Sequence, residues 1–442
     1  MQIQLPEKVH NIIETIQAAG YEAYAVGGCV RDSLLGKEPN DWDITTSAKP
    51  EEIKKLFGRT IDTGIQHGTV TVMMEKEGFE VTTYRIDGEY EDSRHPKEVT
   101  FTANLTEDLR RRDFTINAMA YNEKDGLIDI FGGMQDLEQG IIRCVGNAKE
   151  RFTEDALRMM RAVRFSAQLG YTIEEKTKEA IKELASTLQN ISAERIQTEL
   201  VKLLISDHPD FLRTAYETNL TKYFLPEFDL CMVTTQNNPH HCYDVGEHIL
   251  HTLQEIKPDK VLRLSMLFHD IGKPQTKTVD EKGISHNHGH ASVGEEMTVK
   301  ILHRLKFDND TIFKVRKLVR YHDYKVEPSA KYVRRAVNRI GEDIFPLLFP
   351  VKYADIMAQS DYQREEKLKR LNEIREIYEQ ILERKECLSL KELAVTGSDL
   401  IAAGMQPGKE IGTTLAGFLE IVLENPEYNR KEYLLSLLPS QE

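Results

Sequence analysis

The sequence predicts an α+β protein that has a mixed sheet with helices in its first third and is mostly α-helical afterwards. In the first 145 residues, segments rich in β-branched residues alternate with segments of helical periodicity. Later segments, such as residues 154–165, have helical periodicity. A chain of 442 residues with 40% hydrophobic content can form several cores. At roughly 100–200 residues per domain, this length predicts two to four domains.

The first elements are predicted from apolar spacing and from the residues that end a helix. Pro6–Ala19 has helical periodicity and ends before a glycine, and Glu51–Phe57 forms a second helix after a proline. Gly68–Arg85 carries β-branched residues on two arms, which predicts a hairpin turned at Lys76-Glu77-Gly78. Strands that alternate with helices indicate an α/β head.

Composition limits the location and the partners of the chain. A formal charge of −14 argues against sequence-independent coating of nucleic acid. Five scattered cysteines without a Cys-x-x-Cys pair are typical of a reducing compartment. Neither an apolar run of membrane-spanning length nor a signal peptide is evident, so we expect a cytoplasmic protein without a membrane partner. Basic stretches at 110–112, 158–164, 314–325 and 331–339 are either solvated faces or RNA-binding tracks.

Residues 25–46 contain the most informative motif of the chain. Gly27-Gly28 ends an apolar run and precedes a helix-like segment, which places backbone N–H groups and Arg31 where a triphosphate can be held. Asp41 and Asp43 stand two residues apart beside a predicted strand, so their side chains project to one face. Two such carboxylates predict a magnesium site, and the combination predicts nucleotidyl transfer.

This motif resembles the first motif of the class II tRNA nucleotidyltransferases and bacterial poly(A) polymerases, a branch of the polymerase-β superfamily. The resemblance implies a polymerase-β-like head, Mg²⁺ on Asp41 and Asp43, and CTP, ATP and the tRNA 3′ end as partners. Glu80, on the second arm of the hairpin, is a further metal-ligand candidate or a surface glutamate. Gly28 and Arg31 are implied in nucleotide binding.

A second motif, Arg111-Arg112-Asp113-Phe114-Thr115-Ile116-Asn117, continues the resemblance. It implies that Arg112, Asp113 and Asn117 hold the ribose and the triphosphate, a division of labour that suits guanidinium donors and a carboxylate acceptor. Residues 87–96 resemble a flexible loop of relatives that add the terminal adenosine, which favours addition of CCA over CC alone. An enzyme that adds only adenosine or poly(A) remains the alternative, because that branch shares these motifs.

The segment from Glu154 to Phe165 predicts a helix capped by Thr153. Asp155 and Arg158 then lie three residues apart, and together they complement the Watson–Crick edges of cytosine and adenine but not those of uracil and guanine. The fourth motif of the family, Glu-Asp-x-x-Arg, is credited with this role, with Glu154 orienting the arginine. Arg161 and Arg164 follow on the same helix as nucleotide-binding candidates. A fifth motif implies that Glu194 and Arg195 brace this region.

Histidines accumulate after residue 240, and their pattern resembles the HD phosphohydrolase superfamily. The resemblance implies one divalent metal ion held by His248, His269, Asp270 and Asp355, with Asp361 as the alternative to the last. His290 and His322 would support a second ion. Imidazole and carboxylate suit a divalent transition metal, and such a site activates water for phosphoester hydrolysis, for example of a 2′,3′-cyclic phosphate on RNA.

Together these motifs predict five domains, which are a nucleotidyltransferase head (1–145), a neck that recognises the base (146–205), a connector (206–240), an HD domain (241–365) and a helical, tRNA-binding tail (366–442). The predicted function is template-independent completion of the tRNA 3′ end, with no obligatory protein partner evident. Two readings of other classes remain, which are an HD-type RNA phosphodiesterase with a head that binds RNA, and a non-catalytic RNA-binding protein.

Overall fold

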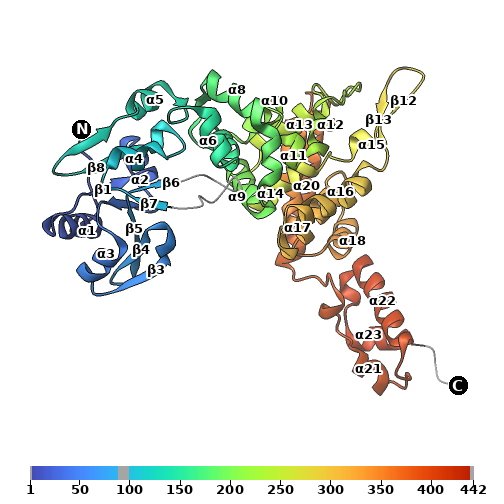
Figure 1. Cartoon of the computed structure of the whole chain (residues 1–442). Coiled ribbons are helices and arrows are strands. Elements are labelled where there is room, and N and C mark those ends of the chain that lie inside the picture. Colours follow the sequence, from blue (N-terminus) through green and yellow to red (C-terminus); the bar gives the residue numbers. More distant parts are fainter. Residues whose placement is uncertain (1, 88–98, 439–442) are drawn as a thin grey trace. The chain divides into compact units, whose positions relative to one another are not determined.

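The computed structural model describes residues 2–87 and 99–438, and the chain divides into two compact units, residues 1–226 and 227–442 (Figure 1). Most of the predicted flexible loop, from residue 88 onwards, lies outside the described residues. The finer division into five domains stays a prediction.

The amino-terminal unit contains α1 (Glu7–Ala18), β1 (Ala23–Val26), α2 (Gly28–Leu34), β2 (Ile44–Thr46), α3 (Pro50–Leu56), β3 (Thr60–Gly64), β4 (Thr69–Met74), β5 (Glu77–Thr83), β6 (Arg85–Asp87), β7 (Val99–Phe101), α4 (Leu105–Arg110), β8 (Met119–Asn122), β9 (Gly126–Asp129), α5 (Gly133–Gln139), β10 (Ile141–Ile142), α6 (Ala148–Glu154), α7 (Leu157–Leu169), β11 (Thr172–Ile173), α8 (Glu175–Leu184), α9 (Ala193–Leu204), α10 (Leu212–Glu217) and α11 (Thr221–Phe224).

The carboxy-terminal unit contains α12 (Pro226–Met232), which begins at the boundary, followed by α13 (Val245–Gln254), α14 (Lys260–Phe268), α15 (Lys273–Thr276), β12 (Thr278–Val279), β13 (Ser285–His286), α16 (His290–Arg304), α17 (Asn309–Tyr321), α18 (Ala330–Ile340), α19 (Leu348–Met357), α20 (Arg364–Glu383), α21 (Gly397–Ala402), α22 (Lys409–Glu424) and α23 (Lys431–Ser436). The prediction of a mostly helical chain after the head is confirmed.

A seven-stranded mixed sheet forms the head, with the strand order β3-β4-β5-β2-β1-β8-β9. The β2–β5 pairing is parallel, and the other pairings in this sheet are antiparallel. The predicted combination of a mixed sheet and helices is therefore confirmed. Because β1 and β2 lie at the centre, the residues that precede β2 are held by strands on both sides.

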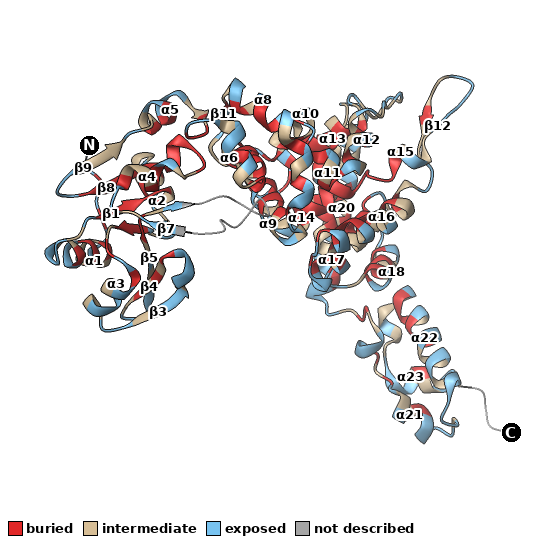
Figure 2. Ribbon diagram, in the orientation of Figure 1, coloured by how far each residue is buried: buried red, intermediate tan, exposed pale blue. Residues whose placement is uncertain are grey.

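The central strand β1 is buried on both faces, as Figure 2 shows. Ala23 and Ala25 pack into a core with α1 and α3, whereas Tyr24 and Val26 pack into a separate core with α4. This division follows from the alternation of side chains along a strand. The strand is thereby fixed from both sides, which gives the adjoining glycine turn a rigid base.

The hairpin of β4 and β5 turns earlier than predicted. Met74 pairs with Glu77, so Glu75 and Lys76 form the turn, and Glu75 has a φ of 58°. Gly78 lies within β5, where a Cβ atom would stand 2.8 Å from Thr71 Cγ2 of the paired strand. The glycine therefore serves close cross-strand packing and not the turn.

The predicted helix that begins at Glu154 is also interrupted. Helix α6 ends at Glu154, Asp155 has an extended backbone with φ −141° and ψ 102°, and α7 begins at Leu157. Thr153 lies inside α6 and donates to the carbonyl of Lys149, so the predicted cap by Thr153 is wrong. Asp155 instead accepts a hydrogen bond from the Leu157 N–H at 3.0 Å and caps α7.

The basic residues of helix α18 form contacts within the carboxy-terminal unit. Arg334 is buried and donates to Glu386 at 2.6 Å and to the carbonyls of Leu423 and Glu424, which end α22. Lys331 also lies 2.5 Å from a carboxylate oxygen of Glu424. The stretch 331–339 is thus engaged in attaching α22. Among the described helices, none combines the length and the apolar character needed to cross a membrane.

Candidate active site and metal centre

Asp41 and Asp43 lie in the segment that leads into β2, because the strand itself begins at Ile44. The carbonyl of Asp43 accepts a hydrogen bond from the Val26 N–H at 3.0 Å, which fixes Asp43 beside the end of β1. In the parallel pairing Ile44 stands opposite Val81, so Glu80 neighbours Asp43 across the two strands. The structure therefore brings the three predicted carboxylates to one corner of the sheet.

The electrostatics of this corner suit a hard cation. Desolvation raises the pKa of the Asp43 carboxyl, and the charges of Asp41 and Glu80 raise it further, while Arg112 opposes them. A divalent cation would relieve this repulsion, and carboxylate oxygens are the ligands that Mg²⁺ prefers. In the described part of the chain, the carboxylate oxygens of Asp41, Asp43 and Glu80 do not all lie within 4.8 Å of one another.

The glycine turn makes room for Arg112. Gly27 has a φ of 85°, and a Cβ atom there would stand 3.0 Å from Nη1 of Arg112. Arg112 also approaches Asp108, with 3.8 Å between Nη2 and Oδ2. Within the described part of the chain, Nε of Arg112 is a buried donor without a hydrogen-bond partner. A guanidinium with an unused buried donor is suited to a phosphate oxygen.

A continuous hydrogen-bond network connects the first two motifs with the neck helix. Arg31 Nη1 donates to Asn117 Oδ1 at 2.7 Å, Asn117 Nδ2 donates to Asp113 Oδ1 at 3.2 Å, and Arg161 Nε donates to Asp113 Oδ2 at 2.7 Å. Burial acts to raise the pKa of Asp113, but Arg161, Arg158 and the hydrogen bonds lower it to about 2. Four residues from three separate segments of the chain are thus fixed relative to one another.

The residues predicted to select the base have separate partners. Arg158 Nη1 lies 2.6 Å from Glu154 Oε2, as expected if Glu154 orients it, and Nη2 donates to the carbonyl of Arg111 at 3.0 Å. Asp155 forms a two-pronged ion pair with Arg195 of α9, with distances of 2.7 and 3.3 Å. Asp155 and Arg158 therefore stand near each other, but each is held by a different residue.

Arg164 differs from its neighbours in being directed into the protein. Its side chain is buried, its Nε donates to Glu199, and its Nη1 donates to Gln168 Oε1 at 2.7 Å. The guanidinium also covers the ring of Phe165 at 3.8 Å. These contacts hold α7 against α9, and a nucleotide-binding role for Arg164 stays a prediction.

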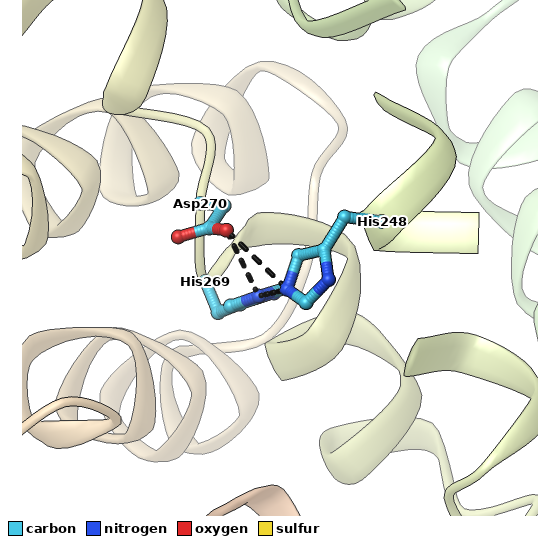
Figure 3. Close-up of side chains that lie close together, drawn as sticks. All are labelled: His248, His269 and Asp270. Carbon is cyan, nitrogen blue, oxygen red and sulfur yellow. Dashed lines mark hydrogen bonds and ion pairs between the residues drawn. The ribbon is translucent and has the colours of Figure 1, made fainter. Parts of the chain in front are cut away.

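The carboxy-terminal unit brings the four predicted HD ligands together. His248 lies on α13, His269 and Asp270 directly follow α14, and Asp355 lies on α19. His248 Nε2 stands 3.2 Å from His269 Nε2 and 2.9 Å from Asp355 Oδ1 (Figure 3 shows the first two with Asp270). The alternative, Asp361, is exposed and pairs with Arg364. Asp355 is therefore the fourth member of the cluster.

His290 and His322 form a second group around the other oxygen of Asp270. Their Nε2 atoms lie 3.2 Å apart, and they stand 3.6 and 3.7 Å from Asp270 Oδ1. Asp270 Oδ2 faces the first group, 3.5 Å from His248 and 3.3 Å from His269. Asp270 thus offers one carboxylate oxygen to each of the two histidine groups.

The ring nitrogens of these histidines are oriented by backbone carbonyls. Nδ1 of His269, His290 and His322 lies 2.7–2.8 Å from the carbonyl oxygen three residues earlier, and Nδ1 of His248 lies 3.3 Å from the Ala358 carbonyl. A carbonyl only accepts, so each Nδ1 carries a proton and each Nε2 is left facing inward. Burial acts to lower the pKa of His269, but the charge of Asp270 and its hydrogen bond raise it. Four inward Nε2 atoms beside buried carboxylates fit divalent metal ions, which bind the neutral rings. Burial and the neighbouring His269 lower the pKa of His322 to about 4, in keeping with a neutral ring.

Two further residues of this site were missed by the sequence analysis. Lys273 is buried, and its Nζ lies 2.7 Å from Asp270 Oδ2 and 2.8 Å from Gln236 Oε1. Burial and the charge of Lys273 lower the pKa of His241 to about 3. Both line a cavity of about 340 Å³ that contains Asp270, His290, His322 and Asp355. The spacing of three residues between Asp270 and Lys273 was the sequence feature that could have indicated Lys273.

Comparisons with known proteins agree with this architecture. The family model described as "Poly A polymerase head domain" matches residues 23–143. "Probable RNA and SrmB-binding site of polymerase A" matches residues 170–232, and "tRNA nucleotidyltransferase domain 2 putative" matches residues 288–438. Among solved structures, the Bacillus stearothermophilus CCA-adding enzyme in complex with CTP has a TM-score of 0.75 and 30% identity, covering 98% of this chain and 97% of that chain.

Curated relatives extend the similarity over the whole length. The CCA-adding enzyme of Levilactobacillus brevis is 37% identical and covers 99% of both chains, and that of Enterococcus faecalis is 36% identical, covering 97% of this chain and 95% of the relative. A match to the Lactiplantibacillus plantarum enzyme reaches 59% identity over 45% of this chain and about half, 49%, of that enzyme. The chain therefore belongs to the family of CCA-adding enzymes and is a nucleotidyltransferase.

Proposed function

We propose that this chain adds CCA, or its terminal nucleotides, to the 3′ end of tRNA from CTP and ATP without a nucleic-acid template. The observation that carries this proposal is the network from Arg31 through Asn117 and Asp113 to Arg161. It joins a candidate triphosphate site, beside Asp41 and Asp43, to helix α7, which begins after Asp155 and carries Arg158. The free cysteines among the described residues support a cytoplasmic location.

In the proposed reaction the terminal 3′ oxygen of the tRNA forms a bond to the α-phosphorus, and the bond to pyrophosphate breaks. Asp41, Asp43 and Glu80 would hold Mg²⁺, which would lower the pKa of the 3′-hydroxyl and screen the α-phosphate. Arg112 offers its unused buried donor to a phosphate oxygen, while Gly28 lies in the turn beside it. Asn117 and Asp113 bind the ribose hydroxyls.

The test of the head uses a tRNA that ends before CCA. The double variant Asp41→Asn/Asp43→Asn should reduce incorporation of CTP and ATP at least about a hundredfold, because two cation ligands lose their charge. Asp62→Asn is the matched control, since it removes the charge of a carboxylate that forms an exposed ion pair with Lys54. Sizing the products separates CCA addition from addition of adenosine alone or poly(A). Unchanged incorporation in the double variant would contradict the proposal.

Base selection is assigned to Asp155 and Arg158. The carboxylate accepts from the exocyclic amino group of cytosine or adenine, and the guanidinium donates to the adjacent ring nitrogen. Each nucleotide is offered singly to Asp155→Ala and Arg158→Ala. We expect the preference for CTP and ATP over UTP and GTP to fall more than triphosphate binding falls. An equal loss for all four nucleotides would refute the assignment.

We propose in addition that the histidine cluster is a divalent-metal phosphohydrolase site that cleaves RNA phosphoesters such as 2′,3′-cyclic phosphates. The observation that favours it is the set of inward-facing Nε2 atoms around Asp270. Ions held by His248, His269, Asp270 and Asp355, with His290 and His322, would supply an activated water for the hydrolysis. Lys273 balances the buried charge of Asp270 and offers a donor to the phosphate.

The matched pair Asp355→Asn and Asp361→Asn tests this second site. Binding of Mn²⁺ by calorimetry and hydrolysis of adenosine 2′,3′-cyclic phosphate should both fall in Asp355→Asn. Neither should change in Asp361→Asn, because Asp361 stands outside the cluster. Nucleotide incorporation should persist in both variants. Equal Mn²⁺ binding by the two variants would exclude Asp355 as a ligand.

We also propose the five-domain division with its boundaries near residues 145, 205, 240 and 365. In this division the tail, residues 366–442, contacts the tRNA.

A further inference from the structure

The cavity that contains the histidine cluster has a second wall, which the metal ligands do not use. The hairpin β12–β13 and the residues after it provide Ser285, His286, Asn287 and His288, and Asn238 lies beside them. These side chains are imidazoles, amides and one hydroxyl, and not the apolar groups that fill a core. We define this wall, residues 285–288, as the hairpin wall.

The rings of His286 and His288 are held parallel. Their planes differ by 7° and their centroids lie 5.6 Å apart. Asp280 fixes the first ring through a contact of 2.9 Å with its Nε2. His288 is exposed and His286 is half-buried, so flat aromatic surface is left accessible at the cavity. Parallel, accessible rings of this kind are suited to stacking against a nucleobase, which every base permits through its π face.

The hairpin wall also offers a polar atom that nothing in the described residues satisfies. Oδ1 of Asn287 is buried and has no hydrogen-bond partner among them. The backbone is fixed at the same place, because the Asn287 carbonyl accepts from Nδ1 of His290 at 2.8 Å and Asn237 Nδ2 donates to the Gly283 carbonyl at 2.5 Å. An amide acceptor beside a stacking surface matches the exocyclic amino group of adenine or cytosine.

We infer that the hairpin wall is a nucleoside subsite, in which His286 and His288 stack on the base of the nucleotide whose phosphate reaches the histidine cluster. This inference rests on the proposed phosphohydrolase function and names what selects its substrate. The short link from His286 to His290 places the stacking rings next to a metal ligand, so a base and its own phosphate can be held together. A phosphoester without a base would lose the stacking contact.

The test compares adenosine 2′,3′-cyclic phosphate with the base-free 1-O-methylribose 2′,3′-cyclic phosphate, both with Mn²⁺. We expect the full-length protein to favour the substrate with the base by about tenfold in kcat/KM, within the range of single base–aromatic stacking. The double variant His286→Ala/His288→Ala should abolish this preference and leave hydrolysis of the base-free substrate within about twofold. The aromatic replacement His286→Phe/His288→Phe should retain it, and so should His303→Ala, an exposed histidine of α16 outside the cavity.

A binding measurement separates this inference from the hydrolase proposal. Stacking should quench the fluorescence of 2-aminopurine riboside 3′-phosphate in chelator-treated wild-type protein and not in the double alanine variant. If the wild type hydrolyses neither substrate, the hydrolase proposal fails and the quenching alone decides the subsite. Equal hydrolysis of both substrates, or quenching that the double variant retains, would overturn the subsite while leaving the hydrolase proposal standing.

Discussion

Replacing Arg195 with alanine should weaken base selection without touching any group that contacts the nucleotide in the proposed mechanism. Arg195 holds both oxygens of Asp155, at 2.7 and 3.3 Å, from a helix 40 residues further along the chain. Without this pair the carboxylate keeps the hydrogen bond from the Leu157 N–H but loses the guanidinium that holds both of its oxygens. Arg195 is therefore a positioning residue for Asp155.

The expected loss of free energy follows from how far the Arg195–Asp155 pair is exposed to solvent. Exposed ion pairs contribute about 0.2–1 kcal/mol, and hydrogen bonds to charged groups contribute about 1.5–3 kcal/mol. The side chains of Arg195 and Asp155 are 24% and 16% exposed, which lies between these cases. We expect a loss of about 1–1.5 kcal/mol, which corresponds to a fall of about five- to tenfold in kcat/KM for CTP and ATP.

The assay is single-turnover incorporation of each of the four nucleotides onto tRNA lacking CCA. The ratio of CTP to UTP incorporation should fall in Arg195→Ala, and the same substitution should add little in an Asp155→Asn background. Lys178→Ala removes an exposed pair with Glu217 in the same unit and serves as the control. A uniform decrease for all four nucleotides, or full additivity with Asp155→Asn, would refute the positioning role.

Three further results are expected. Glu199→Gln should lower the free energy of unfolding of the amino-terminal unit by roughly 2–4 kcal/mol in denaturant titrations, because Arg164 keeps its buried charge without a charged partner. The pKa of Asp113 is lowered to about 2, so its ionised carboxylate should stabilise the folded protein by about 2 kcal/mol above about pH 4. This contribution should disappear as the pH falls towards 2. Comparing the denaturant unfolding of Asp113→Asn and wild type over this pH range checks the sign. Mn²⁺ at about a hundred times its Kd should stabilise the carboxy-terminal unit by about 2.7 kcal/mol, and the shift in calorimetric melting should be absent in His248→Ala.

Local patterns predicted the elements whose determinants lie close together in sequence. The strand after Asp43 follows from Ile44 and two threonines, and the helix from Glu7 to Ala18 follows from its apolar spacing and the glycine beyond it. The residues of the histidine cluster were also predicted, because the adjacent His-Asp pair and the surrounding histidines resemble the pattern of the HD phosphohydrolase superfamily. The sequence favoured Asp355 and left Asp361 as the alternative; the structure places Asp355 on α19 beside His248, whereas Asp361 lies beyond the end of that helix.

The errors occurred where distant contacts decide the local conformation. At the break, Asp155 pairs with Arg195, and the approach of this distant residue cannot be read from residues 153–158. The position of the hairpin turn depends on strand pairing, and Gly78 is needed because Thr71 of the paired strand lies too close for a side chain. The basic stretch of α18 was left open between a solvated face and an RNA-binding track, and the sequence did not indicate the buried contacts of Arg334 with the end of α22.

In the proposed metal site, the carbonyl contacts of the four histidines would affect which ion is bound in a cell. Their ring directions are set by the helices and the Ala358 carbonyl, so the geometry offered does not adjust to the preferences of an incoming ion. Nitrogen and oxygen donors alone discriminate weakly among first-row divalent ions, and intrinsic affinity follows the Irving–Williams order. Loading would therefore follow the supply of free manganese, iron, cobalt and nickel in the host, and protein purified from differently grown cultures would differ in its bound metal.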